Sequence, residues 1–483
     1  MANPGSGEAL SGGFEIPLEP RRCDANRASA WAFARGRCRT ATKHVVSHNP
    51  TPPSAIGAKQ ARRAHRPRVS VFSPSHQTRY LDDCMRSLLA QTYEDWEWIV
   101  VLNQGARWRP PVEDSRLRVV IEDDLTGVGA AKQHACSLAL GELLVELDHD
   151  DELRSDALQL IVEAFDAHPE AGFVFSHFAQ IKEDGSRDDM RFDERNGWIY
   201  VETVVDGRSV LQCNSLEAYP HNVSFIWFAP NHVRAFRRAI YELTGGYDAT
   251  KDVLDDQDLM CRMYQLTEFH LIEECIYLQR MHKANTQREN EINARIQRET
   301  VALYDRDIEP NALAWANRRG LKALFLGPLE SKPAGYLGLG RADAPGVDLV
   351  GDFCEGMDLP DSSVGVIRLV DFLPHVPDKV AFFNEAYRLL GHGGMLLTLT
   401  PSTDGRGAFQ DPTHVAFYNE NSFWYFTNRD YAKYVPHISC RFQTSRLVTY
   451  FPSEWHEQNN ISYVCANLMA VKNGPRLGGH LLI

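Results

Sequence analysis

The stretch that decides the fold of the first half begins VSVFSPSHQTRYLDDCMRSLLAQTYEDWEWIVVLNQG (69–105). VSVFSP (69–74) is a short apolar run that ends in a turn, and residues 79–93 place apolar side chains at helical spacing. Three more strand and helix candidates follow in alternation: RLRVVIED (116–123), GAAKQHACSLAL (129–140) and GELLVELD (141–148). Strands that alternate with helices predict a mostly parallel, doubly wound α/β sheet. In such a sheet the ligand site lies at the carboxyl ends of the strands.

A second alternating region follows further along the chain. Its strand candidates are KALFLG (322–327), GVDLV (346–350), VGVIRLV (364–370), GGMLLTLTP (393–401) and SYVCANLMAV (462–471). We therefore expect a disordered basic leader (1–67), a first α/β domain (68–304), a linker (305–320), a second α/β domain (321–473) and a tail (474–483). Within the first domain, residues 183–225 are polar without a clear period, and we expect them to be irregular.

Bulk composition narrows the class of protein. The chain has 483 residues and a net charge of −13, but residues 1–68 alone carry +8, which leaves an acidic body of −21. An acidic body argues against a dedicated nucleic-acid binder. The ten cysteines form no C-x-x-C pair, which favours free thiols in a reducing compartment. We find no apolar run of transmembrane length and no signal peptide, and we expect a cytoplasmic protein.

Three carboxylates follow the apolar run LLVEL directly: Asp148, Asp150 and Asp151. Like charges this close repel one another, and a divalent cation would relieve that repulsion. Hard oxygen ligands suit Mg²⁺ or Mn²⁺, which bind diphosphates as well. The alternative is a solvated acidic turn that caps the next helix through Asp151 or Ser155.

Ordered motifs over residues 68–290 give this acidic cluster a context. Five segments, in this order, resemble those of family 2 glycosyltransferases of the GT-A type. They are the opening segment 69–105, TGVGAAKQHACSLALGELLVELDHDDEL (126–153), FRRAIYELTGGYD (236–248), DDQDL (255–259) and YLQRMHKAN (277–285). The resemblance implies a GT-A doubly wound mixed sheet and transfer of a sugar from a nucleotide-diphosphate sugar donor. It also implies Mn²⁺ or Mg²⁺ as the metal cofactor.

The resemblance also assigns roles by position. Asp148 and Asp150 match the metal-binding carboxylates, and His282 matches a histidine that reaches the metal. The nucleotide-sugar site would comprise Pro74, Ser75, Asn103, Lys132, Asp148 and Asp151. Asp256 matches the general base, while Gly245, Gly246 and Asp255 match the acceptor side. In-line attack would then invert the anomeric configuration.

Some of these residues have simpler explanations, and the chain departs from the family pattern in places. Lys132 also fits a solvated helix residue, His282 a core histidine, and Asp255 and Asp256 a helix N-terminal charge cluster. After the second strand the family has acidic residues where this chain has Leu102-Asn103-Gln104-Gly105. The side-chain carbonyl of Asn103 can still accept a hydrogen bond. We take uridine as the default nucleoside of the donor.

The second region, from GVDLVGDFCEGMDLPDSSVGVIRLV (346–370) to GGMLLTLTPS (393–402), resembles class I S-adenosylmethionine methyltransferases. The resemblance implies a Rossmann-like fold and a possible S-adenosylmethionine site at Gly327, Asp352 and Asp371. However, the first loop holds one glycine, Gly327, where a glycine-rich turn is expected. An active methyltransferase and a degenerate, structural or acceptor-recognising domain both stay open.

We therefore weigh two classes of function. The first is a metal-dependent inverting glycosyltransferase, with or without a second methyltransferase activity. The second is a non-catalytic binding or scaffold protein built on relic nucleotide-binding folds. Glycan, protein and modified nucleic acid are all open as acceptors, and the sequence does not set an oligomeric state. Because a relic has no need for mutually repelling carboxylates, the intact acidic motifs favour the enzyme.

Overall fold

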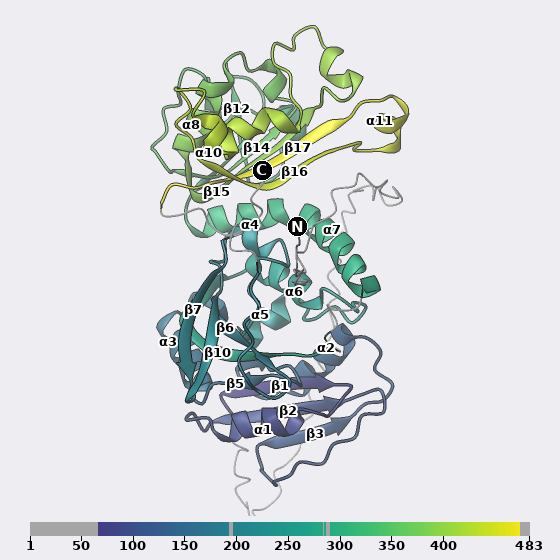
Figure 1. Cartoon of the computed structure of the whole chain (residues 1–483). Coiled ribbons are helices and arrows are strands. Elements are labelled where there is room, and N and C mark those ends of the chain that lie inside the picture. Colours follow the sequence, from purple (N-terminus) through teal and green to yellow (C-terminus); the bar gives the residue numbers. More distant parts are fainter. Residues whose placement is uncertain (1–65, 193–196, 284, 286–289, 474–483) are drawn as a thin grey trace, which may run out of the picture.

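The chain forms two β-sheets, each accompanied by helices, and one long helix lies between them (Figure 1). A computed structural model describes residues 66–192, 197–283, 285 and 290–473. The predicted tail, and all but the last two residues of the predicted basic leader, lie outside these residues. Within the described part of the chain, no helix is long and apolar enough to cross a membrane.

The first sheet has ten strands in the order β3-β2-β1-β4-β9-β6-β10-β5, with the β7–β8 hairpin joined to β6. Strands β1 to β4 are parallel, as the alternating pattern predicts, and β9 adds antiparallel to β4. The mixed, doubly wound sheet is therefore confirmed. Its strands are β1 (Val69–Ser75), β2 (Trp96–Leu102), β3 (Leu117–Ile121), β4 (Leu143–Glu146), β5 (Glu152–Leu153), β6 (Ala171–Lys182), β7 (Ile199–Val205), β8 (Arg208–Asn214), β9 (Arg234–Arg237) and β10 (Glu268–Met281).

Six helices accompany this sheet among the described residues: α1 (Leu81–Leu89), α2 (Val128–Leu138), α3 (Ala157–Ala167), α4 (Pro220–Val223), α5 (Arg238–Leu243) and α6 (Asp255–Tyr264). The apolar side chains of α1 and α3 pack with the buried faces of β1, β2 and β4 in one core. The segment 183–225 was expected to be irregular, but it contains β7, β8 and α4. Asp206 and Gly207 join the two strands with positive φ angles of 46° and 78°, as a tight two-residue hairpin turn requires.

The second sheet has seven strands in the order β13-β12-β11-β14-β15-β17-β16. The first five are parallel, β17 runs antiparallel, and the strand order reverses between β11 and β14. The predicted second α/β domain is confirmed. Its elements are β11 (Lys322–Leu326), η3 (Leu329–Ser331), β12 (Leu337–Gly340), β13 (Leu349–Val350), β14 (Val364–Val370), η4 (Leu373–His375), α8 (Lys379–Leu389), β15 (Leu390–Pro401), η5 (Arg406–Phe409), η6 (Glu420–Phe423), α9 (Trp424–Thr427), α10 (Arg429–Ala432), β16 (Phe442–Tyr450), α11 (Glu454–Gln458) and β17 (Tyr463–Ala470).

Helix α7 (Asn290–Arg318) runs between the two sheets (Figure 1). The segment 305–320, which the sequence analysis assigned to a linker, is mostly the second half of this helix. Helix α7 contributes four buried residues to a core that contains Met260 on one side and Met395 on the other: Tyr304, Ile308, Ala312 and Trp315. Asn311 donates to Ser224 of the first domain (2.9 Å), while Arg446 of the second pairs with Asp305 (2.8 Å). The segment is therefore a packed element shared by both sheets.

Candidate functional site

The acidic turn, residues 148–151, lies at the carboxyl end of β4, the strand between β1 and β9 in the first sheet. Leu147 donates its backbone N–H to Phe72 O (3.1 Å), and Ser73 Oγ donates to Leu147 O (2.5 Å), which fixes the strand end. The chain then turns back through the Asp151 N to Asp148 O bond (3.2 Å) into β5, which pairs antiparallel with β10. This pairing brings the end of β10 beside the acidic turn.

Two carboxylates of the turn are tied to β10. Asp150 Oδ2 lies 2.7 Å from His282 Nε2, so two of the predicted metal ligands meet. Burial alone would raise the pKa of Asp150, but the hydrogen bond from His282 lowers it below its ordinary value. Asp151 is buried, and its two oxygens accept from Tyr277 Oη (2.7 Å) and Arg280 N (2.7 Å). Asp151 therefore faces the interior and braces β10.

Asp148 is the carboxylate of this turn that stays available. Its side chain is 33% exposed, and its nearest charged partners in the described chain, Arg234 and His232, stand 3.8 Å away. Burial, reinforced by the negative charge of Glu146, raises the pKa of Asp148 to about 7. A carboxylate with a raised pKa and no close partner gains most from a bound cation.

One group of metal-ligating side chains converges here. Among the described residues, Asp148, Asp151 and His232 each bring one ligand atom within 4.8 Å of the other two. The predicted ligands Asp150 and His282 are in contact, but Asp148 does not converge with them in this way. Both oxygens of Asp151 already accept hydrogen bonds, which leaves Asp148 as the freer carboxylate of the converging group. Oxygen-rich sets of this kind suit Mg²⁺ or Mn²⁺.

A buried ion network joins the acidic turn to the start of α6. Glu146 is fully buried, and both of its oxygens accept from Arg234 at 2.9 Å. Lys132 Nζ pairs with Glu146 (2.7 Å) and with Asp255 (2.8 Å). Arg234 also pairs with Asp256 (3.1 Å). The Arg234 guanidinium therefore links Glu146 of β4 to Asp256, the predicted general base.

The network fixes the protonation of its members. Burial alone would lower the pKa of Lys132, but Asp255 and Glu146 raise it above its ordinary value. Burial raises the pKa of Asp255, and Asp256 adds to the rise. Lys132, expected beside the diphosphate, thus has two carboxylate partners, and Asp255 is buried in an ion pair.

The predicted nucleotide pocket lies where β1 and β2 end together. Pro74 and Ser75 close β1, and Asn103 follows β2 and donates its backbone N–H to Ser75 O (3.0 Å). Asn103 is 4% exposed, and its Oδ1 has no hydrogen-bond partner in the described residues. A buried acceptor without a partner costs about 1–3 kcal/mol, which a ligand N–H would recover. This atom fits the nucleobase contact expected at this position.

The predicted acceptor glycines line an open cavity of about 500 Å³ with Asp258, Arg262 and Arg306. Gly246 has a φ of 75°, and a Cβ there would lie 2.7 Å from the ring of Tyr241. Glycine is therefore required by the packing of this turn. Asp255, the third residue predicted on the acceptor side, is not among the residues that line this cavity.

The three residues of the possible S-adenosylmethionine site, Gly327, Asp352 and Asp371, do not form a binding site for this cofactor. Gly327 and Asp371 follow the neighbouring parallel strands β11 and β14, but a Cβ on Gly327 would meet Val370 O at 2.5 Å, so this glycine serves strand packing. Asp352 is engaged by Arg341 (2.9 Å) and by Cys354 N (2.9 Å). The described loop after β11 offers no glycine-rich cradle, and these residues do not fit the cofactor.

Sequence reasoning missed several residues of the first site. Glu146, Arg234, His232, Tyr277 and Arg280 carry its ion pairs and hydrogen bonds. A carboxylate inside the apolar run LLVEL was a signal for Glu146, because a buried charge needs a partner. Arg234 and His232 come from β9 and the loop before it, and only the antiparallel pairing of β9 with β4 places them.

Comparison with known proteins agrees with this geometry. Residues 70–242 match the family model for glycosyl transferase family 2, and residues 293–398 match a methyltransferase domain. Both resemblances stated from the sequence are thereby confirmed at the level of these two family models. The methyltransferase match begins inside α7, which agrees with that helix being shared.

Individual relatives are similar over parts of their length. Protein y4gI of Sinorhizobium fredii is 33% identical over 133 residues, 26% of this chain and 14% of that protein. The chondroitin synthase of Pasteurella multocida is 24% identical over 259 residues, 50% of this chain and 24% of that protein. A crystal structure of S. aureus TarS 1–349 in complex with UDP-GlcNAc has a TM-score of 0.36 at 13% identity, covering 52% of this chain and 72% of that one. The chain thus spans a minor part of the two sequence relatives.

Proposed function

We propose that the chain transfers a sugar from a nucleotide-diphosphate sugar to an acceptor hydroxyl, with inversion at the anomeric carbon. The observation that carries the proposal is the meeting of the acidic turn with the start of α6 through Arg234. This guanidinium contacts Glu146 and Asp256 directly and lies 3.8 Å from Asp148. The acidic turn and the base candidate are thus linked through one guanidinium.

In this proposal Asp148, Asp150 and His282 hold Mn²⁺ or Mg²⁺. When bound, the cation neutralises charge that develops on the departing diphosphate. Asn103 Oδ1 accepts from the nucleobase, for which uridine is the first candidate, beside the turn of Pro74 and Ser75. Each of these groups is positioned by a strand end, so little ordering is needed on binding.

Asp256 is proposed as the general base. It lies in the first turn of α6, and its Oδ1 accepts from Gln257 N (2.8 Å) while its Oδ2 faces Arg234 (3.1 Å). These contacts orient the carboxylate to take the proton of an acceptor hydroxyl as that oxygen attacks. Attack from the face opposite the diphosphate inverts the configuration.

The second domain enters the proposal as a structural or acceptor-recognising partner. Its first loop lacks the cradle for S-adenosylmethionine, so no methyl transfer is derived. We propose that residues 68–304 and residues 321–473 are two functional units, and that α7 packs against both. Glycan, protein and modified nucleic acid all fit a hydroxyl acceptor.

Thermal unfolding with UDP and Mn²⁺ tests the proposal without knowledge of the acceptor. A ligand at about 100 times its Kd stabilises the folded state by about 2.7 kcal/mol, which corresponds to a rise in Tm of about 5–10 °C. We expect the rise to need both UDP and Mn²⁺, and to be lost in Asp150→Asn. Asp124→Asn changes an exposed carboxylate of the same domain and is the matched control. Equal rises in wild type and Asp150→Asn would contradict the role of Asp150 at the metal, and the absence of a rise with any nucleoside diphosphate would favour the scaffold.

A further inference from the structure

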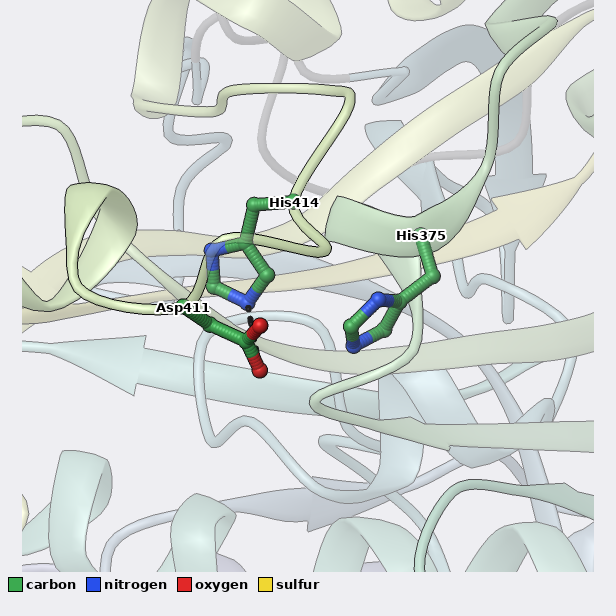
Figure 2. A group of neighbouring side chains, drawn as sticks. All are labelled: His375, Asp411 and His414. Carbon is green, nitrogen blue, oxygen red and sulfur yellow. Dashed lines mark ion pairs between the residues drawn. The ribbon is translucent and has the colours of Figure 1, made fainter.

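A second group of metal-ligating side chains lies in the other domain, far along the chain from the acidic turn. His375 ends η4, directly after β14, while Asp411 and His414 lie in the loop after β15 (Figure 2). Strands β14 and β15 are parallel neighbours, so both loops leave the same carboxyl edge of the sheet. The strand order reverses beside β14, and the crevice at such a switch point is where open α/β sheets bind ligands.

The three side chains converge. One candidate ligand atom from each of His375, Asp411 and His414 lies within 4.8 Å of the other two. His414 Nε2 stands 4.0 Å from Asp411 Oδ2, and the two imidazole rings are 5.1 Å apart between centroids at 72° to each other. Figure 2 shows the rings and the carboxylate facing a common space.

The backbone holds the two loops together. Val415 N and Ala416 N both donate to Pro374 O at 2.9 Å, so the residues next to each histidine are joined directly. His414 N donates to Asp411 O (3.2 Å) and closes the turn that carries both ligands. Main-chain contacts therefore set the relative position of the two loops that carry the three residues.

Hydrogen bonds also leave a lone pair on each ligand. His414 Nδ1 lies 2.8 Å from Ala408 O, and a carbonyl only accepts, so Nδ1 carries the proton and Nε2 is free. Thr413 Oγ1 donates its single proton to Asp411 Oδ1 (2.6 Å), so at His375 Nδ1 (3.3 Å) it accepts. His375 Nε2 and Asp411 Oδ2 therefore stay available. Second partners of this kind fix the tautomer of metal-binding histidines.

A half-buried carboxylate beside the group points in the same direction. Asp371, the residue after β14, has a φ of 51°, a conformation that costs a non-glycine residue about 1 kcal/mol or more. Its Oδ1 is buried without a hydrogen-bond partner in the described chain, and it lies within electrostatic range of both histidines. An ion between the histidines would offset this uncompensated oxygen.

We propose that His375, Asp411 and His414 bind a divalent transition-metal ion of the zinc class. Two imidazoles and one carboxylate suit Zn²⁺ or Fe²⁺ better than Mg²⁺, and three protein ligands leave a position open for an oxygen of a small ligand. Ligand atoms around tetrahedral zinc stand about 3.3 Å apart at Zn–N and Zn–O distances of about 2 Å. His375 and Asp411 are exposed, and their side chains are free to close the remaining gap of at most about 1.5 Å. The site is independent of the proposed sugar transfer.

The test uses the full chain stripped of metal by a chelator, with Mg²⁺ in excess to occupy the acidic turn. Zn²⁺ is titrated by calorimetry, and Co²⁺ by its visible absorption. We expect one equivalent of Zn²⁺, and we expect His375→Ala and His414→Ala to weaken binding at least about 100-fold. Thr413→Val keeps all three ligands and removes only the bridging hydroxyl, so a loss of about 10–100-fold is expected.

Two controls locate the ion. His437→Ala removes an exposed histidine of the same domain, and Asp150→Asn removes a carboxylate of the acidic turn; both should keep the zinc equivalent. Circular dichroism confirms that each variant is folded, and because His375 is exposed its variant should unfold at the wild-type temperature. Unchanged zinc affinity in both folded histidine variants would overturn the proposal, as would the absence of zinc binding in the wild type.

Discussion

Replacing Glu146 by glutamine tests whether the buried ion network holds the first domain together. Glu146 is fully buried and takes contacts from Arg234 (2.9 Å twice), Lys132 (2.7 Å) and Tyr247 Oη (2.8 Å). Glutamine keeps the size but removes the charge, and its amide N–H₂ turns a donor toward two buried cations. Breaking a buried pair by removing one partner costs about 3–5 kcal/mol, so we expect a loss of that size in the free energy of unfolding.

Urea unfolding followed by tryptophan fluorescence measures this loss, because Trp98 is buried in the same sheet. Glu142→Gln is the matched control: Glu142 is exposed and forms ion pairs with the partly exposed Arg68 and Arg237, and such surface pairs are worth about 0–1 kcal/mol. Tyr247→Phe removes a single hydrogen bond to the carboxylate and should cost about 1.5–3 kcal/mol. A loss below 1 kcal/mol in Glu146→Gln, equal to that of the control, would refute the reasoning.

Three further predictions concern other parts of the structure. Burial lowers the pKa of His177, whose Nδ1 accepts from Ser215 N (3.1 Å). Below the ordinary histidine pKa of about 6.5 the unfolded chain therefore takes up a proton at this residue while the folded chain does not, and stability is lost as the pH falls. Urea unfolding at several pH values should show that His177→Asn lacks up to about 1.4 kcal/mol of this loss per pH unit, and parallel pH profiles of the variant and the wild type would contradict it. Gly393 has a φ of 80°, and a Cβ there would meet the ring of Tyr219 at 2.2 Å, so Gly393→Ala should cost about 2–4 kcal/mol in thermal unfolding, and an unchanged Tm would show that the two domains do not touch there. Asn103→Ala should weaken UDP binding about tenfold in calorimetry without lowering the Tm, because the buried Oδ1 has no partner in the described protein; an equal affinity for UDP would exclude its contact with the base.

Much of the fold was predictable because its signals are local. Apolar runs such as WEWIVVLN end in turns and alternate with amphipathic helices, which predicts a doubly wound sheet. The Asp206-Gly207 turn between β7 and β8 was an equally local hairpin signal inside the segment taken as irregular. Strand β16 escaped prediction because its sequence FQTSRLVTY contains four consecutive polar residues, 443–446, and so shows neither an apolar run nor alternation.

Helix α7 shows where local reading fails. Its apolar residues Ile308, Ala312 and Trp315 recur at helical spacing, but Pro310 and the buried polar residues Asp307 and Asn311 interrupt the pattern in the sequence. Tyr304 contacts Ser445 and Arg446 of the second domain, and Asn311 donates to Ser224 of the first. Only the tertiary arrangement reveals that these residues are buried.

The site divides in the same way. Asp148 and Asp150 follow a strand directly and were visible in the sequence, and the structure places Asp150 beside His282 as expected. Arg234 joins Glu146 to Asp256 across 88 and 22 residues of sequence, and no spacing rule predicts such a contact. The group of His375, Asp411 and His414 likewise depends on two loops that meet at the edge of the second sheet.

Hydrolysis of a panel of nucleotide sugars in the presence of Mn²⁺ tests the central claim most directly, because water replaces the unknown acceptor. The account predicts slow release of the nucleoside diphosphate from one donor by the wild type and by Asp124→Asn. Asp150→Asn and Asp256→Asn should each reduce this rate at least about 100-fold, since the proposal assigns the cation to the first residue and the proton to the second. Equal rates in Asp150→Asn and the wild type, or the absence of hydrolysis across a panel that includes UDP- and GDP-sugars, would contradict the account.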